Sequence, residues 1–209
     1  MAFTTSKHEF CFVLVLAFTT FHMVTAGDAD ITSNFAVPPN VPFVDGNFFT
    51  YTAMRALVGA ARPTTFKISK VSMVEFPALT GQSVSFAVLQ FPAGSMNSLH
   101  THPRSAELLF LLTGTLEVGF VDTTNKLITQ TLQVGDVFVF PKGLVHYQFN
   151  RDANNSATAI SAFGSANAGI VSVPTTVFTS GIDAGILAKS FNTDVSTIRA
   201  IKAGLAPKA

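Results

Sequence analysis

Short runs of alternating apolar and polar residues fill the middle of the chain, from residue 66 to residue 174. Gly, Pro, Asn and Asp, which favour tight turns, separate these runs. No segment of helical period interrupts them, so the pattern predicts an antiparallel β-sandwich or a closed barrel, with the jelly roll among the candidates. Strands are expected at 66–73, 83–91, 107–112, 116–121, 127–132, 136–141, 146–150, 158–163 and 169–173.

The composition fits one folded domain with a large core. The chain has 209 residues, of which 48% are hydrophobic and only 12% are charged. Its net charge is +1, and the basic residues form no block or stripe. We therefore expect neither a nucleic-acid partner nor binding to an anionic membrane surface.

The first 26 residues are predicted to be a secretory signal peptide. Lys7 and His8 give a polar start, an apolar stretch follows at 10–21, and Val24 and Ala26 fit the small-residue rule for cleavage after Ala26. The apolar stretch is shorter than the ~18 residues that a membrane span needs. Secretion without a membrane anchor is the expectation.

Residues 27–209 are expected to form a single extracellular domain. Residues 28–46 lack helical or strand period and are predicted to be an extended arm, and 66–174 are predicted to form the barrel. Helical spacing of apolar residues then predicts short C-terminal helices at about 181–204, which serve either as an interface or as a lid on the barrel. The one cysteine, Cys11, lies in the leader, so no disulfide is expected.

Three histidines follow the leader: His100, His102 and His146. His100 and His102 are two residues apart, which points both imidazoles to one face of a strand. Glu107 opens an apolar run, where an unpaired carboxylate is expensive to bury. A metal ion would compensate it, and so would a guanidinium, from Arg104 or Arg55. Three imidazoles and one carboxylate suit a divalent metal with open positions, and Mn, Fe, Ni, Zn and Co are all compatible with them.

The same residues carry a resemblance to a known family. The segments HTHPRSAE (100–107) and GDVFVFPKGLVHYQFN (135–150) closely resemble those of the plant germin-like proteins, single-domain members of the cupin superfamily. Both conserved boxes of cupins are matched in full, at Gly94, His100, His102, Glu107 and Gly114 and at Gly135, Pro141, Gly143, His146 and Asn150. Asn150 could bond the backbone or a neighbouring polar group, but a surface position is the first expectation for it.

The resemblance implies a fold, a cofactor and an assembly. The fold would be an all-β cupin jelly-roll barrel with an extended N-terminal arm and short C-terminal α-helices. One Mn²⁺ per subunit would be held by His100, His102, Glu107 and His146. The protein would be secreted to the plant cell wall, the apoplast, and would assemble as a homohexamer made of three dimers, with the C-terminal helices clasping neighbouring subunits.

Two activities in this family follow from such a metal: superoxide dismutation and oxalate oxidation. In the oxalate-oxidising members two asparagines help to hold the substrate. One matches Asn97, which is therefore a predicted substrate-binding residue, but the other falls at Ala87. Without a hydrogen bond at this position, oxalate would lose binding free energy of order 1–3 kcal/mol. This argues against oxalate as the substrate.

Three hypotheses for function follow. The leading one is a manganese enzyme of the superoxide dismutase type with a role in cell-wall defence. The alternative is a non-catalytic defence, storage or ligand-binding protein in which the metal is structural. A third is a step on a plant secondary metabolite. Asn154 begins the sequon Asn154-Asn155-Ser156 and is a predicted glycosylation site in a surface loop.

Overall fold

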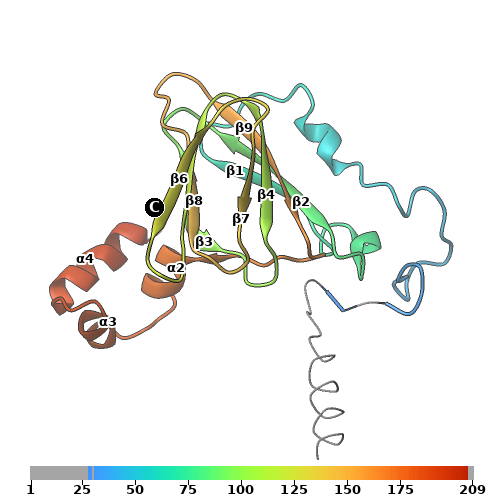
Figure 1. The fold of residues 1–209 in the computed structure, drawn as a ribbon. Coiled ribbons are helices and arrows are strands. Elements are labelled where there is room, and N and C mark those ends of the chain that lie inside the picture. The colour runs from blue at the N-terminus through green and yellow to red at the C-terminus, as the bar shows by residue number, and fades with distance from the viewer. Residues whose placement is uncertain (1–27, 30, 207–209) are drawn as a thin grey trace, which may run out of the picture.

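Two five-stranded antiparallel sheets pack face to face in the computed structural model, which describes residues 28–29 and 31–206 (Figure 1). The predicted leader lies outside the described residues. The strands are β1 (Lys67–Val71), β2 (Ser85–Phe91), β3 (Met96–Thr101), β4 (Glu107–Thr113), β5 (Leu116–Val121), β6 (Leu127–Leu132), β7 (Val137–Phe140), β8 (His146–Phe149), β9 (Ala157–Phe163) and β10 (Val171–Ser172). The predicted all-β barrel is confirmed.

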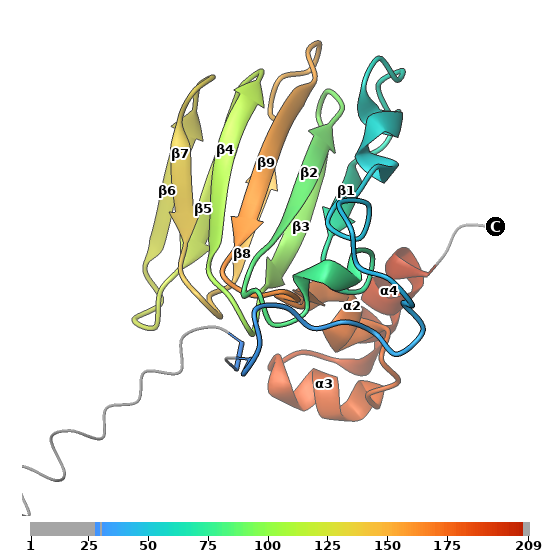
Figure 2. The ribbon, with the colours of Figure 1, turned by 90° about the vertical axis from the view of Figure 1, so that its right-hand side faces the viewer.

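The order of strands is β1-β2-β9-β4-β7 in the first sheet and β10-β3-β8-β5-β6 in the second. In Figure 2 the strands of the first sheet lie side by side in this order. Because β9 returns between β2 and β4, residues far apart in the sequence become neighbours: Ser161 of β9 pairs with Ala87 of β2 and with Leu109 of β4. This crossover makes β2, β9 and β4 adjacent strands of the first sheet, with one face of each toward the interior.

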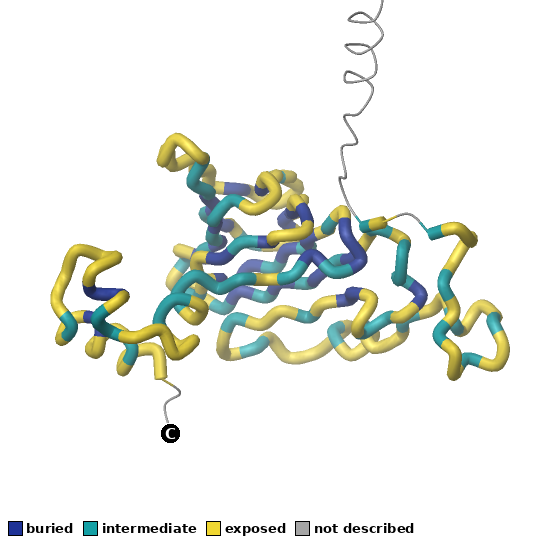
Figure 3. Tube along the Cα trace, turned by 90° about the horizontal axis from the view of Figure 1, so that it is seen from below, coloured by how far each residue is buried: buried dark blue, intermediate teal, exposed yellow. Residues whose placement is uncertain are grey.

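The core lies between the two sheets and follows from the alternation within each strand. Every second residue of β2 is buried, from Ser85 to Phe91, and β4 buries Glu107, Leu109 and Leu111 in the same way. Figure 3 shows that buried positions gather in the strands, whereas the arm and the C-terminal helices are mostly exposed or intermediate. Glu107 is the charged residue that this alternation turns inward.

Strand β3 was not among the predicted strands, although it carries His100. Its sequence, MNSLHT, has two polar residues in place of strict alternation, and its pairing with β8 shifts register between Asn97 and His100. An irregularity of this kind bends a strand and re-aims its side chains. It turns Asn97 and His100 alike into the interior, where both are buried.

The C-terminal segment forms three helices, α2 (Val173–Phe178), α3 (Ala184–Ser190) and α4 (Val195–Leu205). The strand predicted at 169–173 was wrong at its end, because α2 begins at Val173 and accommodates Pro174 in its first turn. Helix α4 ends at Leu205, one residue beyond the range expected for the C-terminal helices. Asp183 and Asp194 cap α3 and α4 with their carboxylates.

The helices and the N-terminal arm lie on opposite sides of the barrel in Figure 1. Leu187, Ala188 and Ile198 form a small core between α3 and α4, and α2 contacts β3 and β10. The described part of the predicted arm, 28–29 and 31–46, contains neither helix nor strand. Two 3-10 turns follow it, η1 (Ala53–Leu57) and η2 (Pro77–Leu79). Within the described residues, no helix has the length and hydropathy of a membrane span.

Candidate metal centre

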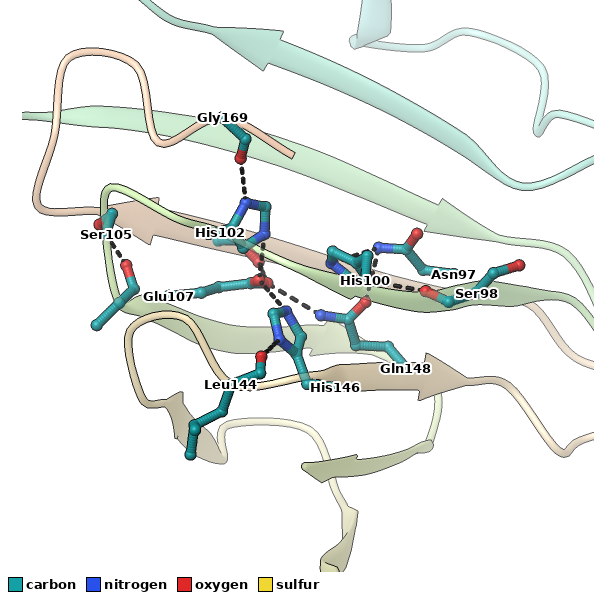
Figure 4. Close-up of polar contacts among 12 residues, drawn as sticks. Asn97, Ser98, His100, His102, Ser105, Glu107, Leu144, His146, Gln148 and Gly169 are labelled. Carbon is teal, nitrogen blue, oxygen red and sulfur yellow. Dashed lines mark hydrogen bonds and ion pairs between the residues drawn. The ribbon is translucent and has the colours of Figure 1, made fainter. Parts of the chain in front are cut away.

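His100, His102, Glu107 and His146 converge inside the barrel, and one ligand atom from each lies within 4.8 Å of all the others (Figure 4). All four side chains are buried. His100 and His146 stand directly opposite each other on the paired strands β3 and β8, and His102 follows β3. Glu107 opens β4 and reaches the group from the other sheet.

Each of the three imidazoles is held by a backbone carbonyl at Nδ1. The Nδ1 atoms of His100, His102 and His146 lie 2.7, 2.5 and 2.8 Å from the carbonyl oxygens of Ser98, Gly169 and Leu144, respectively. A carbonyl oxygen can only accept, so each Nδ1 carries a proton and donates it. In the neutral ring each Nε2 then presents a lone pair toward the centre of the group, as a metal ligand does.

The contacts of Glu107 test whether a cation fits here. Its Oε2 lies 3.0 Å from Nε2 of His102 and 3.1 Å from Nε2 of His146. With Nδ1 protonated and the rings neutral, these contacts bring lone pairs together with no hydrogen between them. A divalent cation among the four atoms would resolve this conflict, and three nitrogens with one carboxylate oxygen are a suitable donor set for it.

Two members of the group, His100 and Glu107, have shifted pKa values. Burial, followed by repulsion from His146, lowers the pKa of His100 to about 4. Burial alone would raise the pKa of Glu107, but the contacts of its carboxylate with His102 and His146 outweigh this and lower the pKa to about 2. At neutral pH the group therefore contains a carboxylate and an uncharged His100.

A second pair of contacts fixes the other oxygen of Glu107. The hydroxyl of Ser161 donates to Oε1 at 2.5 Å, and Nε2 of Gln148 donates to the same atom at 3.1 Å. Both side chains are fully buried. Because Oε1 is occupied in this way, Oε2 is the oxygen that faces the imidazoles.

Arginine does not compensate Glu107. Arg104, one of the two candidates, donates instead to the carbonyl oxygen of Asn167 at 2.6 Å and to its Oδ1 at 3.0 Å. Of the described residues, only His102, His146, Gln148 and Ser161 make polar contacts with the Glu107 carboxylate. The guanidinium of Arg104 also packs so closely on Gly169 that a Cβ there would lie 2.7 Å from Nη2.

Sequence reasoning missed Gln148 and Ser161 and misplaced Asn150. Gln148 follows His146 by two residues on β8, so the same-face argument would have found it. The surface position expected for Asn150 is wrong: the side chain is buried and donates to the carbonyls of Phe91, Pro92 and Asn155. Its amide ties the end of β2 to the loop after β8.

The remaining predicted residues lie as follows. Asn97 is buried beside the group, with its Nδ2 2.8 Å from Oε1 of Gln148 and 3.4 Å from Nε2 of His100. Its role toward a substrate stays a prediction. Asn154 is exposed in the loop after β8, where its backbone N–H donates to Asp152 at 2.8 Å, and its glycosylation stays a prediction as well.

A cavity of about 240 Å³ opens beside the group. Asn97, His100, His102 and Glu107 are among its lining residues. Residues of β1 and β2, with the loop 167–170, make up most of the other walls. Ala87, at the position where the oxalate-oxidising germins have asparagine, is among the wall residues.

Comparison with known proteins gives consistent matches. The cupin family model matches residues 59–199. The chain is 56% identical over 192 residues to germin-like protein 9-3 of Oryza sativa subsp. japonica, covering 88% of this chain and 89% of that protein. It is 55% identical to putative germin-like protein 9-2 of the same plant, with 88% of each chain covered. A solved structure of oxalate oxidase with the substrate analogue glycolate superposes with a TM-score of 0.75 at 27% identity, over 87% of this chain and all of that one.

Proposed function

This chain belongs to the germin-like family of plant cupin proteins, and from this premise we propose that it is a metal-dependent enzyme that dismutates superoxide. The observation that carries the proposal is the conflict of lone pairs between Oε2 of Glu107 and the imidazoles of His102 and His146. A bound divalent cation removes that conflict. The proposed metal is Mn²⁺, on the strength of the family resemblance, since the donor set alone is also compatible with Fe, Ni, Zn and Co.

The residues of the chain would hold the metal and leave part of its coordination open. Three nitrogens and one oxygen fill four positions, so two remain for exchangeable ligands if the ion is six-coordinate. The metal, when bound, would supply the change of oxidation state that dismutation requires. The amide of Asn97 lies beside His100, and the cavity that both residues line would give small anions access to the group. The three described histidines all belong to the group, so solvent is the proposed proton source.

Superoxide consumption measured at known manganese content tests this proposal. Protein purified from its native source or loaded with Mn²⁺ is first subjected to elemental analysis. Activity that rises in proportion to bound manganese and exceeds that of free Mn²⁺ is the expected result. If the site is fully occupied by manganese and the protein is no more active than free Mn²⁺, the proposed enzyme activity is contradicted. The proposed metal centre is unaffected by that result.

Oxalate oxidation is not proposed, although the solved structure reported above is an oxalate oxidase. The methyl group of Ala87 on the cavity wall offers no hydrogen bond to a second carboxylate. An oxalate assay on the same preparations checks this point, and we expect no peroxide release.

A structural metal is the second candidate, and the position of Glu107 favours it. His100 and His146 come from the second sheet, with His102 directly after β3, and Glu107 comes from the first sheet, so a bound ion would link the two sheets. His102→Ala separates the candidates. Loss of activity and metal with an intact fold indicates a catalytic ion, whereas unfolding of the same variant indicates a structural one in a defence, storage or ligand-binding protein.

The setting proposed for this activity is the plant apoplast, with secretion directed by the leader and a glycan at Asn154. The assembly proposed is a homohexamer of three dimers. Exposed apolar residues support an interface: Leu108 and Phe110 of β4 lie opposite Val139 and Val137 of β7 on the outer face of the first sheet. Light scattering on the secreted protein tests the assembly, and a monomer would contradict it.

A further inference from the structure

His102 differs from the other two imidazoles of the group in where its support comes from. The carbonyl groups that hold His100 and His146 belong to residues only two positions away in the sequence, whereas Gly169 lies 67 positions from His102. His102 also lies one residue beyond the end of β3. In Figure 4 the carbonyl oxygen of Gly169 points at the ring of His102. The orientation of this ring therefore depends on where the loop 164–170 places that carbonyl group.

Arg104 holds the part of the loop that contains this carbonyl group. Its Nε donates to the carbonyl oxygen of Asn167 at 2.6 Å, and its Nη2 donates to Oδ1 of the same residue at 3.0 Å. Its backbone N–H donates to the carbonyl oxygen of Ala168 at 3.2 Å. Among the described residues, the hydrogen-bond partners of 167–169 outside the loop itself are Arg104 and His102.

Asn167 connects Arg104 to Gly169. Its Oδ1 accepts from the guanidinium and also from the backbone N–H of Gly169, at 3.2 Å. Both of these groups are donors, so the atom between them has to be the acceptor oxygen of the amide. Gly169 has φ +69°, and a Cβ there would lie 2.7 Å from Nη2 of Arg104. The guanidinium, the Asn167 amide and the Gly169 backbone thus form one close-packed unit that ends at the carbonyl facing His102.

The start of the loop is held independently of Arg104. The hydroxyl of Ser85 donates to the carbonyl oxygen of Ser165 at 2.6 Å. Asp28 accepts from the hydroxyl of Ser165 at 2.6 Å and from the backbone N–H of Ala166. Loss of the Arg104 contacts would therefore release residues 167–169 and leave the start of the loop in place.

We propose that Arg104 and Asn167 are positioning residues of the metal centre, which fix the carbonyl group of Gly169 and, through it, the ring of His102. Neither residue belongs to the four-residue group. Without them the acceptor of Nδ1 is displaced, and the ring of His102 is free to turn its Nε2 away from the other donors. Groups that orient a ligand from behind contribute to metal affinity in this way. This inference rests on the proposed metal centre and is independent of the reaction that the centre catalyses.

The charge of Arg104 predicts the opposite effect from its geometry. A cation near the group repels a divalent ion, so loss of the charge alone would tighten metal binding. Loss of the positioning contacts would weaken it. Arg104→Lys separates the two effects, because lysine keeps the charge but lacks the planar fork that reaches both oxygens of Asn167.

Manganese affinity of the full-length secreted protein tests the role of Arg104, in competition titrations with a fluorescent chelator. Arg104→Lys and Arg104→Met are both expected to bind Mn²⁺ about 10–100-fold more weakly than the wild type. Arg62→Met is the matched control, since Arg62 is also exposed and donates to the hydroxyl of Ser156 instead, at 2.6 Å. It should keep wild-type affinity. Unchanged or tighter binding in the Arg104 variants would overturn the inference.

Two substitutions of Asn167 test the same unit without a change at Arg104. Asn167→Ala removes the acceptor oxygen and is expected to weaken Mn²⁺ binding about 10–100-fold. Asn167→Asp keeps an oxygen that accepts from both donors, so it should bind Mn²⁺ at least as tightly as the wild type. If Asn167→Ala binds Mn²⁺ as the wild type does, the inference is wrong. This pair decides the question even if the Arg104 variants fail to fold.

The EPR spectrum of bound Mn²⁺ distinguishes positioning from a general loss of stability. Because the orientation of the His102 ring affects the symmetry of the donor set, the fine structure at saturating Mn²⁺ should change in Arg104→Lys and Asn167→Ala. It should match the wild type in Asn167→Asp and in Asp28→Ala, which loosens only the start of the loop. A wild-type spectrum in Arg104→Lys and Asn167→Ala, or an equal change in Asp28→Ala, contradicts the assignment to Arg104 and Asn167.

The outcomes separate this inference from the proposed function. Wild-type protein that takes up no divalent metal overturns the metal centre and this inference together. Protein that binds Mn²⁺ and shows the expected losses in the variants, but does not consume superoxide, contradicts the proposed activity and supports this inference. Equal Mn²⁺ affinity in the wild type and in the Arg104 and Asn167→Ala variants overturns this inference alone.

Discussion

Ser161 donates a 2.5 Å hydrogen bond to Oε1 of Glu107, from a strand that lies beside β4 in the same sheet. Removing this donor should let the carboxylate rotate and weaken its hold on a metal. Ser161→Ala is expected to lower Mn²⁺ affinity about 10–100-fold, in a competition titration with a fluorescent chelator. Ser72→Ala, which loses a buried hydroxyl bonded to Glu75 instead, is the control and should keep wild-type affinity. Equal affinities in the two variants would show that Ser161 does not position the ligand.

Gln148 connects Asn97 to Glu107 through its own amide. Gln148→Leu keeps the size of the side chain but leaves two buried polar groups without their partner. The variant is expected to lose about 1–3 kcal/mol of stability for each group, measured by urea unfolding of the metal-free protein. Gln130→Leu, at an exposed position of β6, should be close to the wild type. If Gln148→Leu has the same free energy of unfolding as the wild type, the hydrogen bonds of Gln148 do not stabilise the fold.

Strand prediction succeeded where alternation and turn residues agreed, as in β2 and β4, and failed where they did not. The adjacent polar residues Asn97 and Ser98 break the alternation in β3, so the pattern did not predict this strand. Its register shift against β8 cannot be predicted from the spacing of residues in the sequence. In α2, the β-branched residues and Pro174 suggested the end of a strand. Packing of the helix against β3 and β10, which the sequence does not reveal, outweighed that local preference.

The four candidate ligands of the site could be predicted from the sequence, but the residues that support them could not. Imidazoles and an inward carboxylate are rare enough in an apolar pattern to attract attention, and His100 and His102 share a face by their spacing. Ser161 belongs to a strand that becomes a neighbour of β4 only through the crossover of β9. Its hydroxyl is indistinguishable in the sequence from any other serine, so only the fold identifies it.

Asp28, the first described residue, forms hydrogen bonds with the loop that precedes Gly169. Its carboxylate accepts from the hydroxyl of Ser165 at 2.6 Å and from the backbone N–H of Ala166. Asp28→Ala leaves both donors without this partner and is expected to lower the thermal midpoint by about 2–4 °C. Asp45→Ala, which breaks only a local turn at Asn47, should shift it less. A larger shift for Asp45→Ala would contradict this ranking.

Removal of the metal should lower the thermal stability of the barrel. A ligand that binds only the folded state at 100 times its dissociation constant adds about 2.7 kcal/mol. Scanning calorimetry in excess chelator and then in Mn²⁺ measures the difference. His146→Ala removes one proposed ligand and should show little response to Mn²⁺. An equal response in that variant would indicate that Mn²⁺ acts at another place.

Asp194 should make the C-terminal helices sensitive to acid. Hydrogen bonds from Ser196 and Thr197 hold the pKa of its carboxyl below the ordinary value of 3.8. Because the folded-state pKa is the lower one, the stabilising effect is complete above pH 3.8 and is lost as the pH falls through the folded value. The thermal midpoints of wild type and Asp194→Ala should thus differ at pH 6 and converge in stronger acid. A difference independent of pH would contradict the role of the charge.

His100 and His146 pair within one sheet, and Glu107 arrives from the other. All four donors therefore meet only when β3, β8 and β4 have assembled, so the complete donor set exists in the folded barrel and not in the unfolded chain. A divalent ion bound there would stabilise the folded state, and unfolding would release it.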